Sequence, residues 1–215
     1  MIFETNNIYH IYNQGNNHQK IFFYHKNYLY FLRKIKDHIL PYADLLAWCL
    51  MPNHFHLLVF VNKLELGSEA FTKGEKKIYD TLTQSEGFTT LNDSIGTMLR
   101  SYTRAINIQQ ERSGSLFRRK TKAKFIARVG NEVIPSMDKT PPDKVADKKA
   151  SLTALISDRE YLQDCFNYIH DNPVEAGLVT HIKEWEFSSY LDYTDLRKWN
   201  QVNIERANEL GLEVH

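Results

Sequence analysis

Two apolar segments on either side of a turn signal constrain the fold of this chain more than any other feature. Residues 44–50 and 57–61 are almost entirely apolar, and the turn-forming pair Pro52-Asn53 lies between them. The length of each segment is typical of a strand rather than a helix. The sequence therefore predicts a β-hairpin of two mostly buried strands, the second of them central in a sheet.

Two histidines stand at the start of the second strand. Because side chains alternate across a strand, His54 and His56 project from one face and Phe55 from the other. Two imidazoles fixed on a rigid strand provide half of a metal site, although histidines at this spacing also occur as solvent-facing or core residues. The metallo-hydrolase pattern His-x-His-x-Asp-His is excluded, because Leu58 and Val59 occupy its last two positions.

Hydrophobic periodicity predicts the other elements. It indicates strands at 8–13 and 123–129, helices at 27–40, 94–110 and 158–170, and a short helix at 75–82. This order favours an α+β fold, an antiparallel sheet with helices packed on one face. We expect one domain over residues 1–215, with Asp93 as the N-cap of the helix at 94–110. The polar, proline-containing stretch at about 130–157 is expected to be an inserted loop.

Composition and cysteine usage restrict the setting of the protein. No apolar run approaches the roughly 20 residues that a membrane span needs, and the N-terminus lacks a signal-peptide pattern. The two cysteines, Cys49 and Cys165, lie in apolar segments and are expected to be buried free thiols. We therefore expect a cytoplasmic protein. No Gly-rich phosphate-binding loop is present, so no nucleotide cofactor is expected.

Positive charge is concentrated in residues 100–128. This stretch holds nine basic residues and one acidic residue, a net charge of +8, whereas the whole chain carries +1. Such a concentration favours a polyanionic partner such as DNA, because phosphate contacts release counterions; a solvated basic face is the alternative. The DNA-binding candidates are Arg100, Arg104, Arg118, Arg119, Lys120, Lys122 and Lys124.

Tyr102 lies on the apolar stripe of the helix predicted at 94–110. Its neighbours on that stripe include Met98 and Ile106, so the tyrosine faces the sheet. Spacing alone is typical of a core tyrosine. The same geometry would also carry its hydroxyl to the sheet face that bears His54 and His56, which favours a functional role.

Five segments of the chain, taken together, resemble one family. They are residues 9–17, 49–59, 101–107, 114–117 and 168–179. Their order and content resemble the single-tyrosine HUH transposases, in which U is a hydrophobic residue, and most closely the REP-associated tyrosine transposases. The resemblance covers most of residues 8–193. It implies a ferredoxin-like core and DNA transposition by nicking and rejoining of single-stranded DNA, with hairpin DNA as the partner.

The resemblance also implies the chemistry of the site. Tyr102 would be the nucleophile, and a divalent cation, Mg²⁺ or Mn²⁺, would be held by His54 and His56. Attack on DNA would leave a 5′-phosphotyrosine intermediate and a free 3′-hydroxyl. Relatives include both monomers and homodimers, so the oligomeric state stays open.

The third metal ligand is harder to place. Many single-tyrosine HUH enzymes carry a glutamine four residues after the tyrosine, one helical turn on. Here that position holds Ile106, which cannot bind a metal. Asn107 follows it, and its spacing from Tyr102 resembles the REP-associated branch, so the resemblance implies Asn107 as the third ligand. Gln109, on the tyrosine's own face of the helix, is the alternative.

Two other functions are compatible with the same residues. One is a non-catalytic, domesticated protein that binds hairpin DNA. The other is a metal-dependent nuclease that activates water and uses Tyr102 only structurally. A covalent link between protein and DNA distinguishes the transposase from both.

Overall fold

The computed structural model of the chain describes residues 1–67, 88–130, 145–197, 199 and 201–214, and for 145–157 it describes the backbone alone. The helix predicted at 75–82 lies outside the described residues. Among those described, no helix is long and apolar enough to cross a membrane.

A four-stranded antiparallel sheet forms the centre of the molecule. Its strands are β1 (Asn7–Gln14), β2 (Ala43–Met51), β3 (His54–Val61) and β6 (Lys122–Arg128), in the order β2-β3-β1-β6. The tight turn at residues 52–53 joins β2 to β3, and β1 pairs with β3 on one side and β6 on the other. The predicted hairpin and the central position of its second strand are both confirmed.

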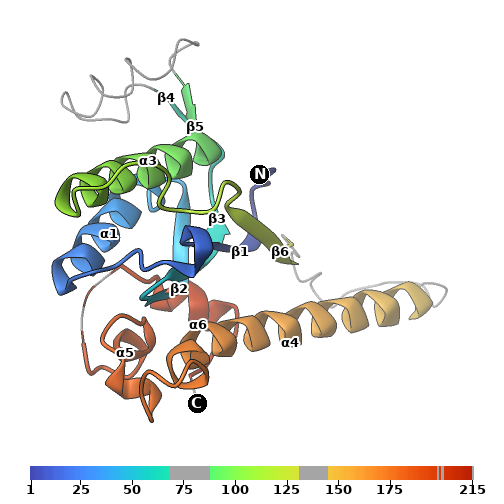
Figure 1. Cartoon of the computed structure of the whole chain (residues 1–215). Coiled ribbons are helices and arrows are strands. Elements are labelled where there is room, and N and C mark those ends of the chain that lie inside the picture. The colour runs from blue at the N-terminus through green and yellow to red at the C-terminus, as the bar shows by residue number, and fades with distance from the viewer. Residues whose placement is uncertain (68–87, 131–144, 198, 200, 215) are drawn as a thin grey trace.

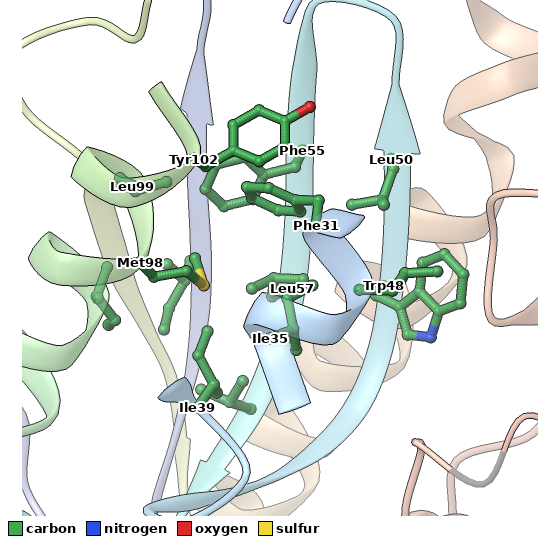
Figure 2. Close-up of a cluster of buried hydrophobic side chains, with 14 of the residues drawn as sticks. Phe31, Ile35, Ile39, Trp48, Leu50, Phe55, Leu57, Met98, Leu99 and Tyr102 are labelled. Carbon is green, nitrogen blue, oxygen red and sulfur yellow. The ribbon is translucent and has the colours of Figure 1, made fainter. Parts of the chain in front are cut away.

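Two helices cover one face of this sheet. They are α1 (His25–His38) and α3 (Leu91–Gln109), which also pack against each other (Figure 1). Their apolar stripes meet the sheet in a core that includes Phe31, Ile35, Leu57 and Met98, all fully buried (Figure 2). The order β1-α1-β2-β3-α3-β6 with this strand arrangement is the ferredoxin-like pattern. The predicted fold class is therefore confirmed.

The opposite face of the sheet is covered by a third long helix, α4 (Val145–Glu175). Phe166 and Ile169 of α4 pack on Leu46 of β2 and Leu58 of β3 in a second apolar cluster. In Figure 1, α4 lies on the other side of the sheet from α1 and α3. The sheet is thus enclosed by helices on both faces, one face more than the predicted pattern requires.

Helix α4 is longer than the sequence predicts at both ends. Residues 145–157, expected to belong to an inserted loop, are helical, while residues 131–144 lie outside the description. The helix also continues through Pro173 to Glu175, beyond the end predicted at residue 170. Pro173 lies two residues from the end of α4, so the hydrogen bond that its missing N–H would give to the Ile169 carbonyl is lost only in the last turn of the helix.

Short elements complete the fold. They are η1 (Asn16–His18), β4 (Glu65–Gly67), β5 (Phe88–Thr90), η4 (Ile182–Glu184), α5 (Tyr190–Tyr193) and α6 (Ile204–Glu209). Thr90, not Asp93, caps α3, because the Thr90 side chain accepts the Asp93 backbone N–H at 3.1 Å. The C-terminal segment lies along β2 through bridges at Cys49–Ser188 and Leu45–Val202.

Candidate functional site

The alternation of β3 separates an apolar face from a polar one. Phe55 and Leu57 point toward α1 and α3, whereas His54 and His56 point toward α4. The two imidazole rings lie with centroids 4.9 Å apart and planes at 90°. The prediction that the histidines share a face and lie side by side is confirmed.

His56 is buried, with 5% of its surface exposed, and one of its two ring nitrogens is engaged. Its Nδ1 lies 2.8 Å from Nε2 of His10 on the neighbouring strand β1. Its Nε2 is buried and has no hydrogen-bond partner among the described residues. Burial, followed by the proximity of His10 and His54, holds the pKa of His56 well below its usual value. The ring is therefore neutral near pH 7, the form that binds metal ions.

His54 is arranged in a similar way. Its Nδ1 lies 2.6 Å from the Oδ1 atom of Asn53, which can only accept, so Nδ1 carries the proton. Its Nε2 lies 3.3 Å from Oδ1 of Asn172 on α4. Burial lowers the pKa of His54, and the contact with Asn172 partly opposes that shift. In the neutral ring, Nε2 therefore presents a lone pair toward an amide oxygen.

The side-chain orientation of Asn172 follows from a second contact. Its Nδ2 donates to the backbone carbonyl of Tyr168, one turn earlier in α4, at 2.8 Å. Its oxygen is thereby directed at His54. Two acceptors that face each other lack a proton between them, and a cation placed there would satisfy both.

Tyr168 lies next to the histidines on the same face of the sheet. Its ring centroid is 5.5 Å from that of His56 and 6.2 Å from that of His10. The side chain is 43% exposed, so a bound substrate could reach it. Because Tyr168 and Asn172 are four residues apart on one helix, both project from the same side of α4.

Tyr102 lies on the opposite face of the sheet. Its ring is fully buried against Phe31 and the first core cluster, and its hydroxyl donates to the carbonyl of Ile21 at 2.9 Å (Figure 2). Burial raises the pKa of this phenol, which disfavours the phenolate. The expectation that Tyr102 meets His54 and His56 is therefore wrong. Helix α3 does face the sheet as predicted, but it covers the face that carries Phe55.

Asn107 is also absent from the histidine site. It lies on α3, where its Nδ2 donates to the carbonyl of Gly114 at 2.8 Å. Gln109, the alternative ligand, exchanges a hydrogen bond with Asn27 of α1. Neither side chain can join the two histidines, because the sheet stands between them.

The donor set around the histidines fits a divalent cation. Among the described residues, no three His, Cys, Asp or Glu side chains form a metal-binding group. The available donors are Nε2 of His54, the unpartnered Nε2 of His56 and Oδ1 of Asn172. Two imidazole nitrogens with one amide oxygen leave coordination positions for water or phosphate oxygens, so this donor set could hold a divalent cation.

A basic groove of about 1010 Å³ lies between α3 and residues 111–121, on the face of the sheet opposite the histidines. Asn107 and Phe117 contribute to its wall. The arginines that line it are Arg100, Arg104, Arg112, Arg118 and Arg119. Glu111 also lines the groove, but the described residues include no ion pair between these arginines and a carboxylate, so five arginines and one glutamate leave it with a net positive charge.

The remaining predicted DNA-binding residues lie elsewhere. Lys120 lines a neighbouring hollow together with Arg100 and Arg119. Lys122 and Lys124 lie on edge strand β6 and point to the histidine face. The Lys122 amino group is 5.7 Å from the centre of the Tyr12 ring, and Lys124 lies 4.9 Å from that of Tyr161. The basic residues of one sequence segment are thus divided between the two faces of the sheet.

Sequence reasoning missed Tyr168, Asn172 and His10 as members of this site. A signal for the first two was present, because Tyr168 and Asn172 have the tyrosine-to-amide spacing of four that Tyr102 lacks. They also belong to one of the five matching segments, residues 168–179. His170 in the same segment is structural, since its Nε2 lies 2.7 Å from the Ser189 hydroxyl beside β2.

No protein-family model and no curated protein matches this chain. Among solved structures, the chain is similar to a REP-associated tyrosine transposase bound to a REP hairpin. The TM-score is 0.50 and the sequence identity 12%, and the match covers 91% of this chain and 83% of that one. At this identity the likeness establishes a shared fold over nearly the whole length of the chain.

Proposed function

We propose that this protein is a metal-dependent tyrosine transposase that nicks and rejoins single-stranded DNA near hairpins. Tyr168 is the nucleophile in this proposal, and His54, His56 and Asn172 are the metal ligands. The structural neighbour supports the proposal at the level of fold and hairpin DNA. The residues of the site support it at the level of chemistry.

One observation carries the proposal. Helix α4 brings an exposed tyrosine and an amide oxygen to the sheet face that holds two histidines with available Nε2 atoms. A nucleophile beside a cation site is the arrangement that phosphoryl transfer needs, because catalysis there depends on positioning and on neutralising charge. No tyrosine of α3 meets this requirement, since Tyr102 is enclosed by the core.

The proposed reaction conserves the energy of the phosphodiester. The Tyr168 oxygen attacks phosphorus and gives its proton to water, and the bond from phosphorus to the 3′-oxygen breaks. The 3′-oxygen takes up a proton, and the 5′-phosphate stays on Tyr168. When bound, a divalent cation supplies Lewis-acid polarisation of a non-bridging phosphate oxygen. A 3′-hydroxyl of another strand then reverses the step and rejoins the DNA without ATP.

The basic residues support DNA binding on both sides of the sheet. Lys122, beside Tyr12 on the histidine face, is placed to contact phosphates close to the scissile bond. The arginine groove along α3 is placed to hold DNA farther from the chemistry. Phosphate contacts of this kind position the nucleic acid without reading its sequence.

The test is a search for a covalent protein–DNA adduct. Labelled hairpins with randomised single-stranded flanks are incubated with Mn²⁺ and resolved on a denaturing gel, so that no single target sequence has to be guessed. We expect a slow, protease-sensitive band with the wild type and with Tyr102→Phe, and none with Tyr168→Phe. Tyr102→Phe is the matched control, because it removes the other candidate hydroxyl.

Each other result assigns a different function. An adduct that survives in Tyr168→Phe contradicts the assignment of the nucleophile. Metal-dependent cleavage without an adduct, unchanged in both variants, indicates a nuclease that activates water. Binding of hairpins without cleavage from the randomised pool indicates a non-catalytic DNA-binding protein.

A further inference from the structure

The contact between His10 and His56 has no role in the chemistry described above. His10 lies on β1 with 7% of its surface exposed, and its Nε2 is 2.8 Å from Nδ1 of His56. In the strand register, Tyr12 is directly opposite His56, so His10 is its diagonal neighbour on the same face. The contact therefore joins the two central strands of the sheet.

The position of His10 is fixed by rings on both sides. Its ring packs on Tyr12 at a centroid distance of 4.8 Å and stacks on His56 at 5.0 Å. The edge of Tyr168 approaches it at 6.2 Å. A side chain enclosed in this way holds one orientation, so its nitrogen meets His56 at a constant place.

The proton between the two rings can belong to either partner. If His10 donates, the remaining proton of a neutral His56 is on Nε2, where it has no acceptor and blocks a metal. If His56 donates from Nδ1, its Nε2 carries the free lone pair. His54 shows the second arrangement, because its Nδ1 donates to Asn53 and leaves Nε2 available.

We propose that His10 is a positioning residue that accepts a hydrogen bond from Nδ1 of His56 and so directs the Nε2 lone pair of His56 toward the metal. This inference rests on the proposed metal site. His10 itself is no ligand, since its Nε2 is committed to His56 and, for this contact, its own proton is on Nδ1. Histidine ligands commonly donate their second nitrogen to an outer partner, and loss of that partner typically lowers metal affinity 10–100-fold.

The test compares two substitutions at position 10. His10→Phe keeps a ring between Tyr12 and His56 but removes the acceptor, whereas His10→Gln supplies a carbonyl oxygen. Mn²⁺ affinity is measured from the electron paramagnetic resonance signal of free Mn²⁺. We expect about 10–100-fold weaker binding in His10→Phe and a clearly smaller loss in His10→Gln. His38→Phe, a buried histidine change on α1, is the control and should leave the affinity unchanged.

A second measurement reports the tautomer directly and needs no metal. In ¹⁵N-histidine-labelled protein, long-range ¹H–¹⁵N NMR spectra distinguish the protonated ring nitrogen from the bare one, with His56→Ala used to assign the signals. We expect His56 to be protonated at Nδ1 in the wild type and to lose that preference in His10→Phe. The thermal unfolding midpoint of each variant confirms that it is folded.

The outcomes separate this inference from the proposed function. A wild type in which His56 is protonated at Nε2, or a His10→Phe variant with unchanged tautomer and Mn²⁺ affinity, overturns the role of His10. If the wild type fails to bind Mn²⁺ but His56 has the expected tautomer controlled by His10, the positioning contact stands and the metal assignment fails. If His10→Phe does not fold, His10→Leu replaces it as the variant without an acceptor and is compared with His10→Gln in the same way.

Discussion

The two faces of the central sheet have the same strands and opposite characters. On the face covered by α1 and α3, the rings of Phe31, Phe55 and Tyr102 pack in an apolar core in which the Tyr102 hydroxyl is hydrogen-bonded. On the face covered by α4, the turn end of β3 holds a polar cluster with an unpartnered nitrogen on His56. Alternate residues of a single strand are thus divided between stability and chemistry.

This difference shows that the surroundings of a tyrosine, rather than its position on a helix that faces the sheet, decide whether it can meet a substrate. Tyr102 and Tyr168 both project toward the sheet from long helices. Tyr102 is fully buried and its pKa is raised by burial, while Tyr168 is 43% exposed beside two imidazoles. The first is suited to hold the core together, and the second can meet a substrate.

The largest expected effect is the loss of DNA cleavage when either histidine of β3 is replaced. His54→Ala and His56→Ala should each reduce DNA cleavage about a thousandfold or more, because loss of several kcal/mol of charge stabilisation corresponds to that factor. Stability and much of the DNA binding should be retained. Cleavage on denaturing gels and binding by fluorescence anisotropy measure the two effects.

Phe55→Ala, at the position between the two histidines, should reduce the stability of the protein rather than its cleavage of DNA. It removes a fully buried ring and should lower the free energy of unfolding by about 3–5 kcal/mol, measured in urea. If the histidine variants lost stability on that scale, or if either kept wild-type cleavage, the division of roles between the two faces would be wrong.

A second comparison concerns the two asparagines that were candidates for the third ligand. Asn172→Ala should weaken Mn²⁺ binding at least 10-fold, since it removes an oxygen directed at the His54 ring. Asn172→Asp keeps the oxygen, adds a negative charge and should bind Mn²⁺ at least as tightly as the wild type. Asn107→Ala lies across the sheet and should leave the affinity unchanged; a loss there would restore Asn107 as a ligand.

The arginine groove gives a smaller and more gradual effect. Arg104→Gln combined with Arg119→Gln should reduce the slope of log affinity against log salt by about 1.4, or roughly 0.7 for each single-strand phosphate contact. Arg33→Gln with Lys36→Gln, an equal charge change on α1, is the control. Equal slopes for the two double variants would mean that the groove is a solvated surface.

The smallest effect is a loss of stability at alkaline pH, caused by ionisation of Tyr102 in the unfolded chain. Because its folded pKa is raised above the unfolded value of about 10, the stabilisation is complete below pH 10 and is lost as pH rises further. This one phenol should cost about 1.4 kcal/mol between pH 9 and 11 in urea unfolding. The difference in the free energy of unfolding between wild type and Tyr102→Phe should decrease by that amount over this pH range. A constant difference would contradict burial of the phenol.

Much of the fold was predictable because its periodic signals are strong. The hairpin at 44–61 and the apolar stripes of α1 and α3 required only the periods of strands and helices. The length of α4 was underestimated, because Pro173 is a general helix-stop signal and the segment before the predicted helix is polar. The packing of α4 on a second face depends on tertiary contacts of residues such as Phe166 and Ile169, which no local pattern specifies.

The candidate site was half predictable for a related reason. Strand alternation placed His54 and His56 together, but periodicity does not say which face of a sheet a helix covers. One signal was available on β3 itself, because Phe55, Leu57 and the other odd positions are apolar throughout. Helices α1 and α3 are expected to cover that apolar face, which places Tyr102 of α3 there as well. The contact of His10 with His56 follows from strand register, which the sequence leaves open.

The contact between His54 and Asn172 joins residues 118 positions apart along the chain. At synthesis rates of roughly 5–20 residues per second, the ribosome makes them about 6–24 s apart. All four strands of the sheet, with α1 and α3, are complete before α4 is made. A nascent chain therefore contains all four strands of the sheet while it still lacks the proposed nucleophile. Under the proposed function, DNA near a translating ribosome is not cut until Tyr168 and Asn172 have been made.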